Sequence, residues 1–171
     1  MSMNLFLLRV SEARLKDYQL NGKVSERNSL VEDLDHASTI FTKGEFTSIK
    51  KSWEGIVFLM TGKPFEEALT EPFTTVITGR KSLEVALPTA TVAPRYLTST
   101  EVIRAHQMLS LITNEILMDR YNAGVMNDLG IYPGNWEAPE AKSYLLRGFD
   151  HLKDFYAEAA TQKQAVIMFL A

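Results

Sequence analysis

The chain has 171 residues, 46% of them hydrophobic and 23% charged, with a net charge of −3 and a sequence pI near 5.7. This composition is that of a globular protein with a full core, and it excludes a disordered or fibrous chain. The slight acidic excess argues against nucleic acid as a partner, because phosphate binding needs a basic surface. Since there is no cysteine, disulfides, thiol catalysis and thiolate zinc sites are excluded.

The N-terminal third contains two clear elements. Residues 4–10 are apolar on both faces and predict a strand inside a sheet, and Ser11 then caps a helix over 12–20. From residue 48 apolar side chains recur at helical spacing up to Gly62, which predicts a helix with a left-handed terminator. Between them, "TIFT" at 39–42 is interpreted as an edge strand.

The centre of the chain shows β-branched segments followed by a helix signal. "FTTVIT" at 73–78 and "LEVAL" at 83–87 flank "GRKS", a pattern that predicts a hairpin. "TSTE" at 98–101 matches a capping box, so a helix is expected to begin after Thr98.

The C-terminal part is predicted to be mainly helical. Asn122 is expected to cap a short helix, and the strongest apolar seam of the chain runs through 139–160. A closing strand is expected at 165–170. The order of strand, helices, hairpin, helices and strand predicts an α+β fold, in one domain over 1–171, with a modest mixed sheet of about four strands backed by helices.

The two ends of the chain bear on localisation. The apolar runs in "MSMNLFLLRV" and "AVIMFLA" are too short for the core of a signal peptide or for a membrane span. We therefore expect a cytoplasmic protein with no membrane partner. The hydrophobic content and the seven methionines leave homo-oligomerisation open.

Four segments carry a resemblance to a known family. They are "WEGIVFLMTG" at 53–62, "RYLTSTEV" at 95–102, "MNDLGIYPGNW" at 126–136 and "LKDFYAEAA" at 152–160. In this order they resemble the YfbM-like family of small bacterial proteins of unknown function. The resemblance implies a compact α/β-type domain, bacterial origin and a cytoplasmic setting, but no activity.

Motifs for cofactor chemistry are missing. The sequence has no Gly-x-Gly-x-x-Gly fingerprint, no phosphate-binding loop and no Gly-x-Ser-x-Gly elbow. The acidic run "EDLDH" at 32–36 is interpreted as a solvated helix face rather than a cation site. No cofactor and no metal are therefore expected.

The candidate functional residues fall into two groups. His106 and Asp128 are the candidate catalytic acid or base, since a neutral imidazole beside an apolar stripe can accept a proton if a pocket opens there. The candidate ligand-binding residues are Trp53, Arg95, Tyr132 and Trp136. The loop "GIYPGNWE" at 130–137 is either the wall of a polar-floored pocket or a turn whose aromatic side chains pack into the core.

Two functions remain open at this point. The preferred hypothesis is a non-catalytic binding or protein-interaction module with an unknown protein or small-molecule partner, because nearly every conspicuous residue has a structural explanation. The alternative is a small hydrolase that uses His106 or Asp128 near the Tyr132–Trp136 loop.

Overall fold

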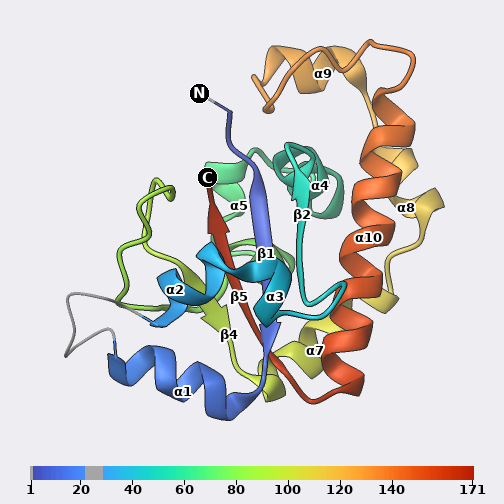
Figure 1. The fold of residues 1–171 in the computed structure, drawn as a ribbon. Coiled ribbons are helices and arrows are strands. Elements are labelled where there is room, and N and C mark those ends of the chain that lie inside the picture. Colours follow the sequence, from blue (N-terminus) through green and yellow to red (C-terminus); the bar gives the residue numbers. More distant parts are fainter. Residues whose placement is uncertain (1, 22–28) are drawn as a thin grey trace.

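The computed structural model describes residues 2–21 and 29–171, and its centre is a pair of long strands. Strand β1 (Leu5–Val10) pairs antiparallel with β5 (Ala165–Leu170), with Leu5 opposite Leu170 and Val10 opposite Ala165. The two ends of the chain therefore lie beside each other (Figure 1). They are joined by hydrogen bonds in both directions between the backbones of Asn4 and Ala171, at 2.7 and 3.1 Å.

Three further strands complete one sheet in the order β2-β1-β5-β4-β3. Strand β2 (Phe46–Lys50) forms one edge, while β4 (Arg95–Leu97) and the two-residue β3 (Lys81–Ser82) form the other. Every strand pair in this sheet is antiparallel. The α+β class is confirmed, but the sheet has five strands rather than about four and is antiparallel rather than mixed.

One face of the sheet is covered by the larger helices. They are α4 (Trp53–Thr61), α7 (Ser99–Ser110) and α10 (Ala141–Thr161). The predicted seam of α10 is buried as expected, including Leu145, Phe149 and Leu152. Shorter helices extend this layer: α5 (Phe65–Ala68), α6 (Thr75–Thr78) after a 3-10 turn (Pro72–Thr74), α8 (Asn114–Arg120) and α9 (Ala123–Asp128).

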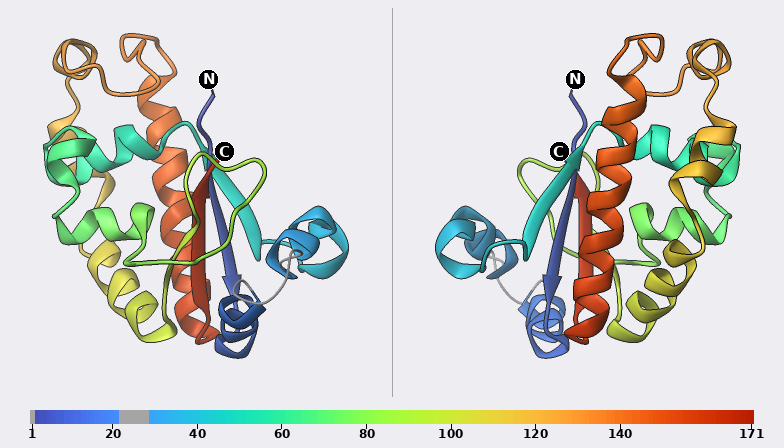
Figure 2. Two further views of the ribbon diagram at one scale, coloured as in Figure 1. Left: turned by 90° about the vertical axis from the view of Figure 1, so that its left-hand side faces the viewer. Right: turned by 90° about the vertical axis from the view of Figure 1, so that its right-hand side faces the viewer.

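The opposite face is covered by a second, smaller layer. It contains α1 (Glu12–Asn21), α2 (Ser29–Asp35), α3 (Ala37–Ile40) and the extended segment 83–87. Figure 2 shows the sheet edge-on between the two layers. Side chains of β1 and β5 consequently alternate between two separate cores, with Leu7 and Val166 in one and Leu8 and Ile167 in the other.

Several local predictions are confirmed. Gly62 ends α4 in the left-handed conformation with φ of 74°. Thr98 and Glu101 form the complete capping box of α7, and the side chain of Asn122 accepts from the backbone N–H of Val125 at the start of α9. The Ser11 side chain accepts from the N–H of Arg14 at 3.1 Å, as expected at the start of α1. The predicted end of this helix at Asn21 and Gly22 falls partly outside the described residues.

Three strand or helix predictions are wrong. Residues 72–78 form the 3-10 turn and α6 instead of a strand, so the predicted hairpin with 83–87 does not exist. The first two residues of the "TIFT" segment end α3 and the other two belong to no strand, and the edge strand lies instead at 46–50. Ile49 consequently belongs to β2, and α4 begins only at Trp53.

No helix within the described ranges is long and apolar enough to cross a membrane.

Candidate functional site

The Tyr132–Trp136 loop is held together by hydrogen bonds to its own surroundings. The Tyr132–Pro133 peptide is cis, and Gly134 has φ of 84°. Trp136 is buried, and its indole N–H donates to the carbonyl of Ile131 at 2.8 Å. Its backbone N–H donates to Oδ1 of Asn127 at 3.1 Å. The indole of Trp136 therefore packs in the core, with its polar atom satisfied locally.

The side chains of Trp53 and Tyr132 lie next to each other and contact the N-terminal segment of the chain at Met3. Their ring centroids are 6.2 Å apart, and Phe65 makes an edge contact with Trp53 at 5.1 Å. The indole of Trp53 donates to the carbonyl of Met3 at 3.1 Å, while the hydroxyl of Tyr132 accepts from the N–H of Met3 at 2.9 Å. Both aromatic side chains thus fix the backbone that leads into β1.

A partly buried carboxyl group lies beside this loop. Burial raises the pKa of Glu54, a hydrogen bond with the Tyr132 backbone opposes that rise, and the nearby charge of Glu66 adds to it. Sequence reasoning did not identify Glu54, because its helical position gives no hint that the loop of residues 130–137 folds over it.

His106 and Asp128 occupy separate parts of the molecule. His106 is half-buried on α7, whereas Asp128 is exposed at the end of α9, and Figure 1 places these two helices at opposite ends of α10. The described part of the chain contains four cavities of note, and neither His106 nor Asp128 lines any of these four. The arrangement thus brings no acid–base pair together from these two positions.

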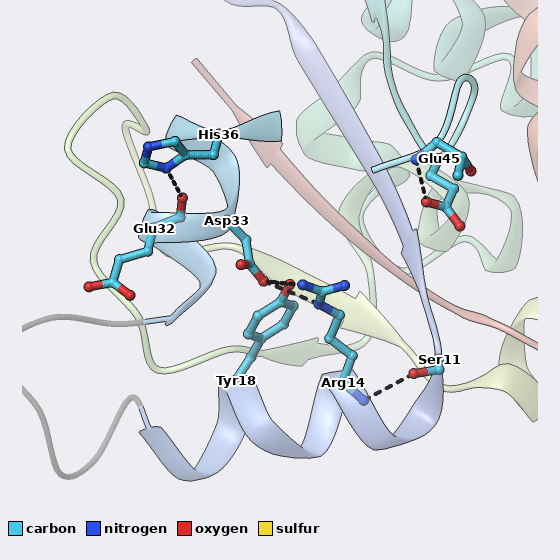
Figure 3. A network of polar contacts seen from close by, with 8 residues as sticks. Ser11, Arg14, Tyr18, Glu32, Asp33, His36 and Glu45 are labelled. Atoms are coloured by element: carbon cyan, nitrogen blue, oxygen red, sulfur yellow. Dashed lines mark hydrogen bonds and ion pairs between the residues drawn. The ribbon is translucent and has the colours of Figure 1, made fainter. Parts of the chain in front are cut away.

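The acidic run at 32–36 is tied into a structural network (Figure 3). Oδ2 of Asp33 accepts from Nε and Nη2 of Arg14 at 3.1 and 2.9 Å and from the hydroxyl of Tyr18 at 2.5 Å. Burial, followed by the hydrogen bond to Asp33, raises the pKa of Tyr18. This network fastens α2 to α1. Across residues 2–21 and 29–171, no three histidine or acidic side chains gather to hold a metal ion.

A cavity of about 670 Å³ lies where α5 and α6 meet the ends of β1, β4 and β5. Its volume is within the range of small-molecule sites, which are concave, mostly apolar and equipped with a few polar groups. The inner wall is apolar, with Ile77 from α6 and Met168 and Leu170 from β5. Leu69 and Val92 also line the cavity, although these side chains are 53% and 60% exposed. We call Leu69 and Val92 the apolar rim.

The charged groups of this cavity include Arg95, one of the predicted ligand-binding residues. Arg95 begins β4 and is exposed; Arg80 and Glu71 also line the cavity. Glu71 is ion-paired with Lys63, so its charge is already compensated. Trp53, Tyr132 and Trp136 do not line this cavity, so the structure separates Arg95 from the three aromatic candidates.

Gly79 shapes the wall between α6 and β4. Its φ is 64°, and a Cβ at this position would lie 2.7 Å from Sδ of Met168 and 2.9 Å from Cβ of Arg95. A side chain would therefore be strained in backbone conformation and would also collide with the wall. The glycine allows the end of α6 to approach the β4–β5 pair closely.

Sequence reasoning missed this cavity because it is assembled from segments distant in the chain, around residues 69–80, 92–95 and 168–170. The segment 73–78 was predicted as a strand, so the wall formed by α6 was not anticipated. One signal was present: "LEVALPTATVAP" at 83–94 has an isolated valine, Val92, among small and polar residues.

The sequence matches the family described as a domain of unknown function, DUF1877, over residues 1–169. A comparison with curated proteins gave no match. A solved structure titled "The Crystal Structure of a Protein of Unknown Function YfbM from Escherichia coli" is similar in fold. Its TM-score is 0.65 at 16% sequence identity, and the alignment covers 98% of this chain and 99% of that one. The chain therefore belongs to the DUF1877 family and has the YfbM-like fold.

Proposed function

We propose that this protein is a non-catalytic binding module whose site is the 670 Å³ cavity beside α5 and α6. The observation that carries the proposal is the exposed apolar rim. Leucine and valine side chains that remain more than half exposed at the mouth of an apolar cavity provide surface that a ligand can remove from water. The bound molecule is expected to be small, because the volume matches small-molecule sites.

The hydrolase alternative receives less support from the geometry. A general acid or base must lie within hydrogen-bond reach of the reacting group. His106 and Asp128 lie on different helices, and neither lines the 670 Å³ cavity. The binding function is therefore preferred.

The proposed setting is the bacterial cytoplasm. Support for a bacterial source comes from the Escherichia coli origin of the YfbM structure.

The test uses the uncharged fluorescent probe N-phenyl-1-naphthylamine, whose emission rises in apolar surroundings. We expect saturable binding to the wild-type protein and weaker binding to Leu69→Asp and Val92→Asp. Losing one rim contact of about 1 kcal/mol corresponds to roughly a fivefold higher Kd.

The matched control is Leu111→Asp, which adds the same charge at a leucine that is 72% exposed and does not line the cavity. This variant should bind the probe like the wild type. The proposal fails if the wild type shows no saturable binding, or if the control loses as much affinity as the two rim variants.

A further inference from the structure

Arg95 is held in a fixed position at the cavity. Its Nε donates to the carbonyl of Thr78 at 2.7 Å, and its Nη2 donates to the carbonyl of Arg80 at 3.0 Å. The first acceptor is the last residue of α6, and the second directly precedes β3. A guanidinium has five N–H donors, so two bonds orient the group and leave others for a ligand. Because the side chain is already ordered, binding loses little further conformational freedom.

The charge of Arg95 has no acidic partner among the described residues. The ion pairs within residues 2–21 and 29–171 join Arg14 to Asp33, Lys63 to Glu71 and Arg80 to Glu101. The last of these is a wide contact of 3.9 Å, and the side chain of Arg80 is 57% exposed. Arg95 is therefore a positive charge without an acidic partner among these residues, whereas the lining carboxylate of Glu71 is already paired with Lys63. The electrostatic balance of the lining favours an anion.

The apolar part of the cavity is continuous with this cationic part. Arg95 and Met168 are directly opposite each other on β4 and β5, and both lie against Gly79, so the carbon stem of the arginine and the apolar wall are neighbours. Leu69 and Val92 line the same cavity. A molecule with a charged end and an apolar body would satisfy both parts, whereas a small inorganic anion would leave the rim exposed.

We infer that the cavity binds an organic anion with an extended apolar body, whose terminal oxyanion accepts hydrogen bonds from Arg95. The inference rests on the proposed function, since it specifies the ligand class of that same cavity. A carboxylate or a phosphate ester supplies the required head group, because both match the planar fork of a guanidinium. Arg80, whose side chain is 57% exposed, adds a second positive charge to the same lining.

The experiment compares ligands that share a decyl chain and differ in the head group. Decanoate, decyl phosphate, decanol and decyltrimethylammonium each compete against bound N-phenyl-1-naphthylamine below their critical micelle concentrations. Charge-assisted hydrogen bonds to a fixed guanidinium predict at least a tenfold lower inhibition constant for one of the two anions than for decanol. The cation should bind more weakly than decanol. The inhibition constants of decanoate and decyl phosphate show which of the two head groups, carboxylate or phosphate ester, is preferred.

Variants assign the preference to a residue. Arg95→Gln should reduce the ratio of decanol to anion inhibition constants to about one, and Arg95→Lys should retain part of it, because it keeps the charge without the fork. Arg147→Gln is the matched control: it removes the same charge from an exposed site on α10 that does not line the cavity. It should keep the wild-type ratio.

The outcomes separate this inference from the proposed function. If the wild type does not bind the uncharged probe, the proposed function itself fails. If the probe binds but decanol or the decyl cation competes as well as both anions, the inference is overturned while the binding function stands. This wild-type comparison does not depend on the folding of any variant. The inference is also overturned if Arg147→Gln lowers the ratio as much as Arg95→Gln, since net charge would then explain the preference.

Discussion

Replacing Gly55 by alanine tests how tightly the 130–137 loop is packed on α4. A Cβ at Gly55 would lie 2.7 Å from Cδ2 of Leu145 and 2.8 Å from Cη2 of Trp136. Both side chains are buried, so neither can move aside into solvent. Overpacking of a core costs about 1–3 kcal/mol, whereas glycine to alanine within a helix gains about 1 kcal/mol. With two buried groups in the way, we expect the free energy of unfolding to fall by about 1–2 kcal/mol.

The measurement is urea unfolding followed by far-UV circular dichroism, with an unchanged slope showing that the unfolded state is comparable. Gly124→Ala is the matched control: a Cβ there would meet only Oδ1 of Asn122, at 3.5 Å. It should gain up to about 1 kcal/mol. Trimming the indole in the double variant Gly55→Ala/Trp136→Phe should cost less than the sum of the two single changes. The packing argument is refuted if Gly55→Ala stabilises the protein as Gly124→Ala does.

Two further predictions concern helix α7 and the alkaline limit of stability. Thr98→Ala removes the capping box and should lower the free energy of unfolding by about 1 kcal/mol in the same assay; an effect no larger than that of the exposed Ser110→Ala would contradict it. Burial raises the pKa of Tyr156, whose hydroxyl donates to the carbonyl of Val76 at 2.8 Å. The unfolded state therefore loses this proton first, and its contribution to stability is complete below about pH 10 and declines by about 1.4 kcal/mol per pH unit above it. Tyr156→Phe should flatten this decline; equal slopes in both proteins would disprove the assignment.

Local signals with a side-chain mechanism could be read from the sequence alone. Thr98 with Glu101, Asn122 and Gly62 each end or begin a helix by satisfying backbone groups within a few residues. The long seam of α10 was equally clear, because its apolar residues recur over many turns. In these places local chemistry and tertiary packing agree.

The failed strand at 73–78 shows where local propensity loses to packing. "FTTVIT" is rich in β-branched residues, but Pro72 suits the first turn of a helix and Gly79 ends α6. The helical turn buries both Val76 and Ile77 in the core. In the segment 83–87 every second side chain is buried in the second core, so the predicted alternation of apolar and polar residues is confirmed. The segment has no strand partner, however, so the predicted hairpin is wrong.

The site was less accessible to sequence reasoning than the fold. The aromatic residues of the 130–137 loop were conspicuous, yet two of their polar atoms bond backbone groups of Ile131 and Met3. Arg95 was identified as a candidate, but its surroundings were not, because the cavity depends on how α6 packs against the end of β5. A cavity formed by segments that are distant in the sequence produces no periodic pattern of residues from which it could be predicted.

The position of β5 has a consequence for biosynthesis. This strand is the third of five in the order of the sheet but the last of the five along the chain, so the other four leave the ribosome before it. Until residues 165–170 emerge, the β2–β1 pair and the β4–β3 pair have no common partner, and each presents an open edge to solvent. Both cores can therefore close only after residues 165–170 have been synthesised, and during that interval the nascent chain is most exposed to aggregation and to chaperones.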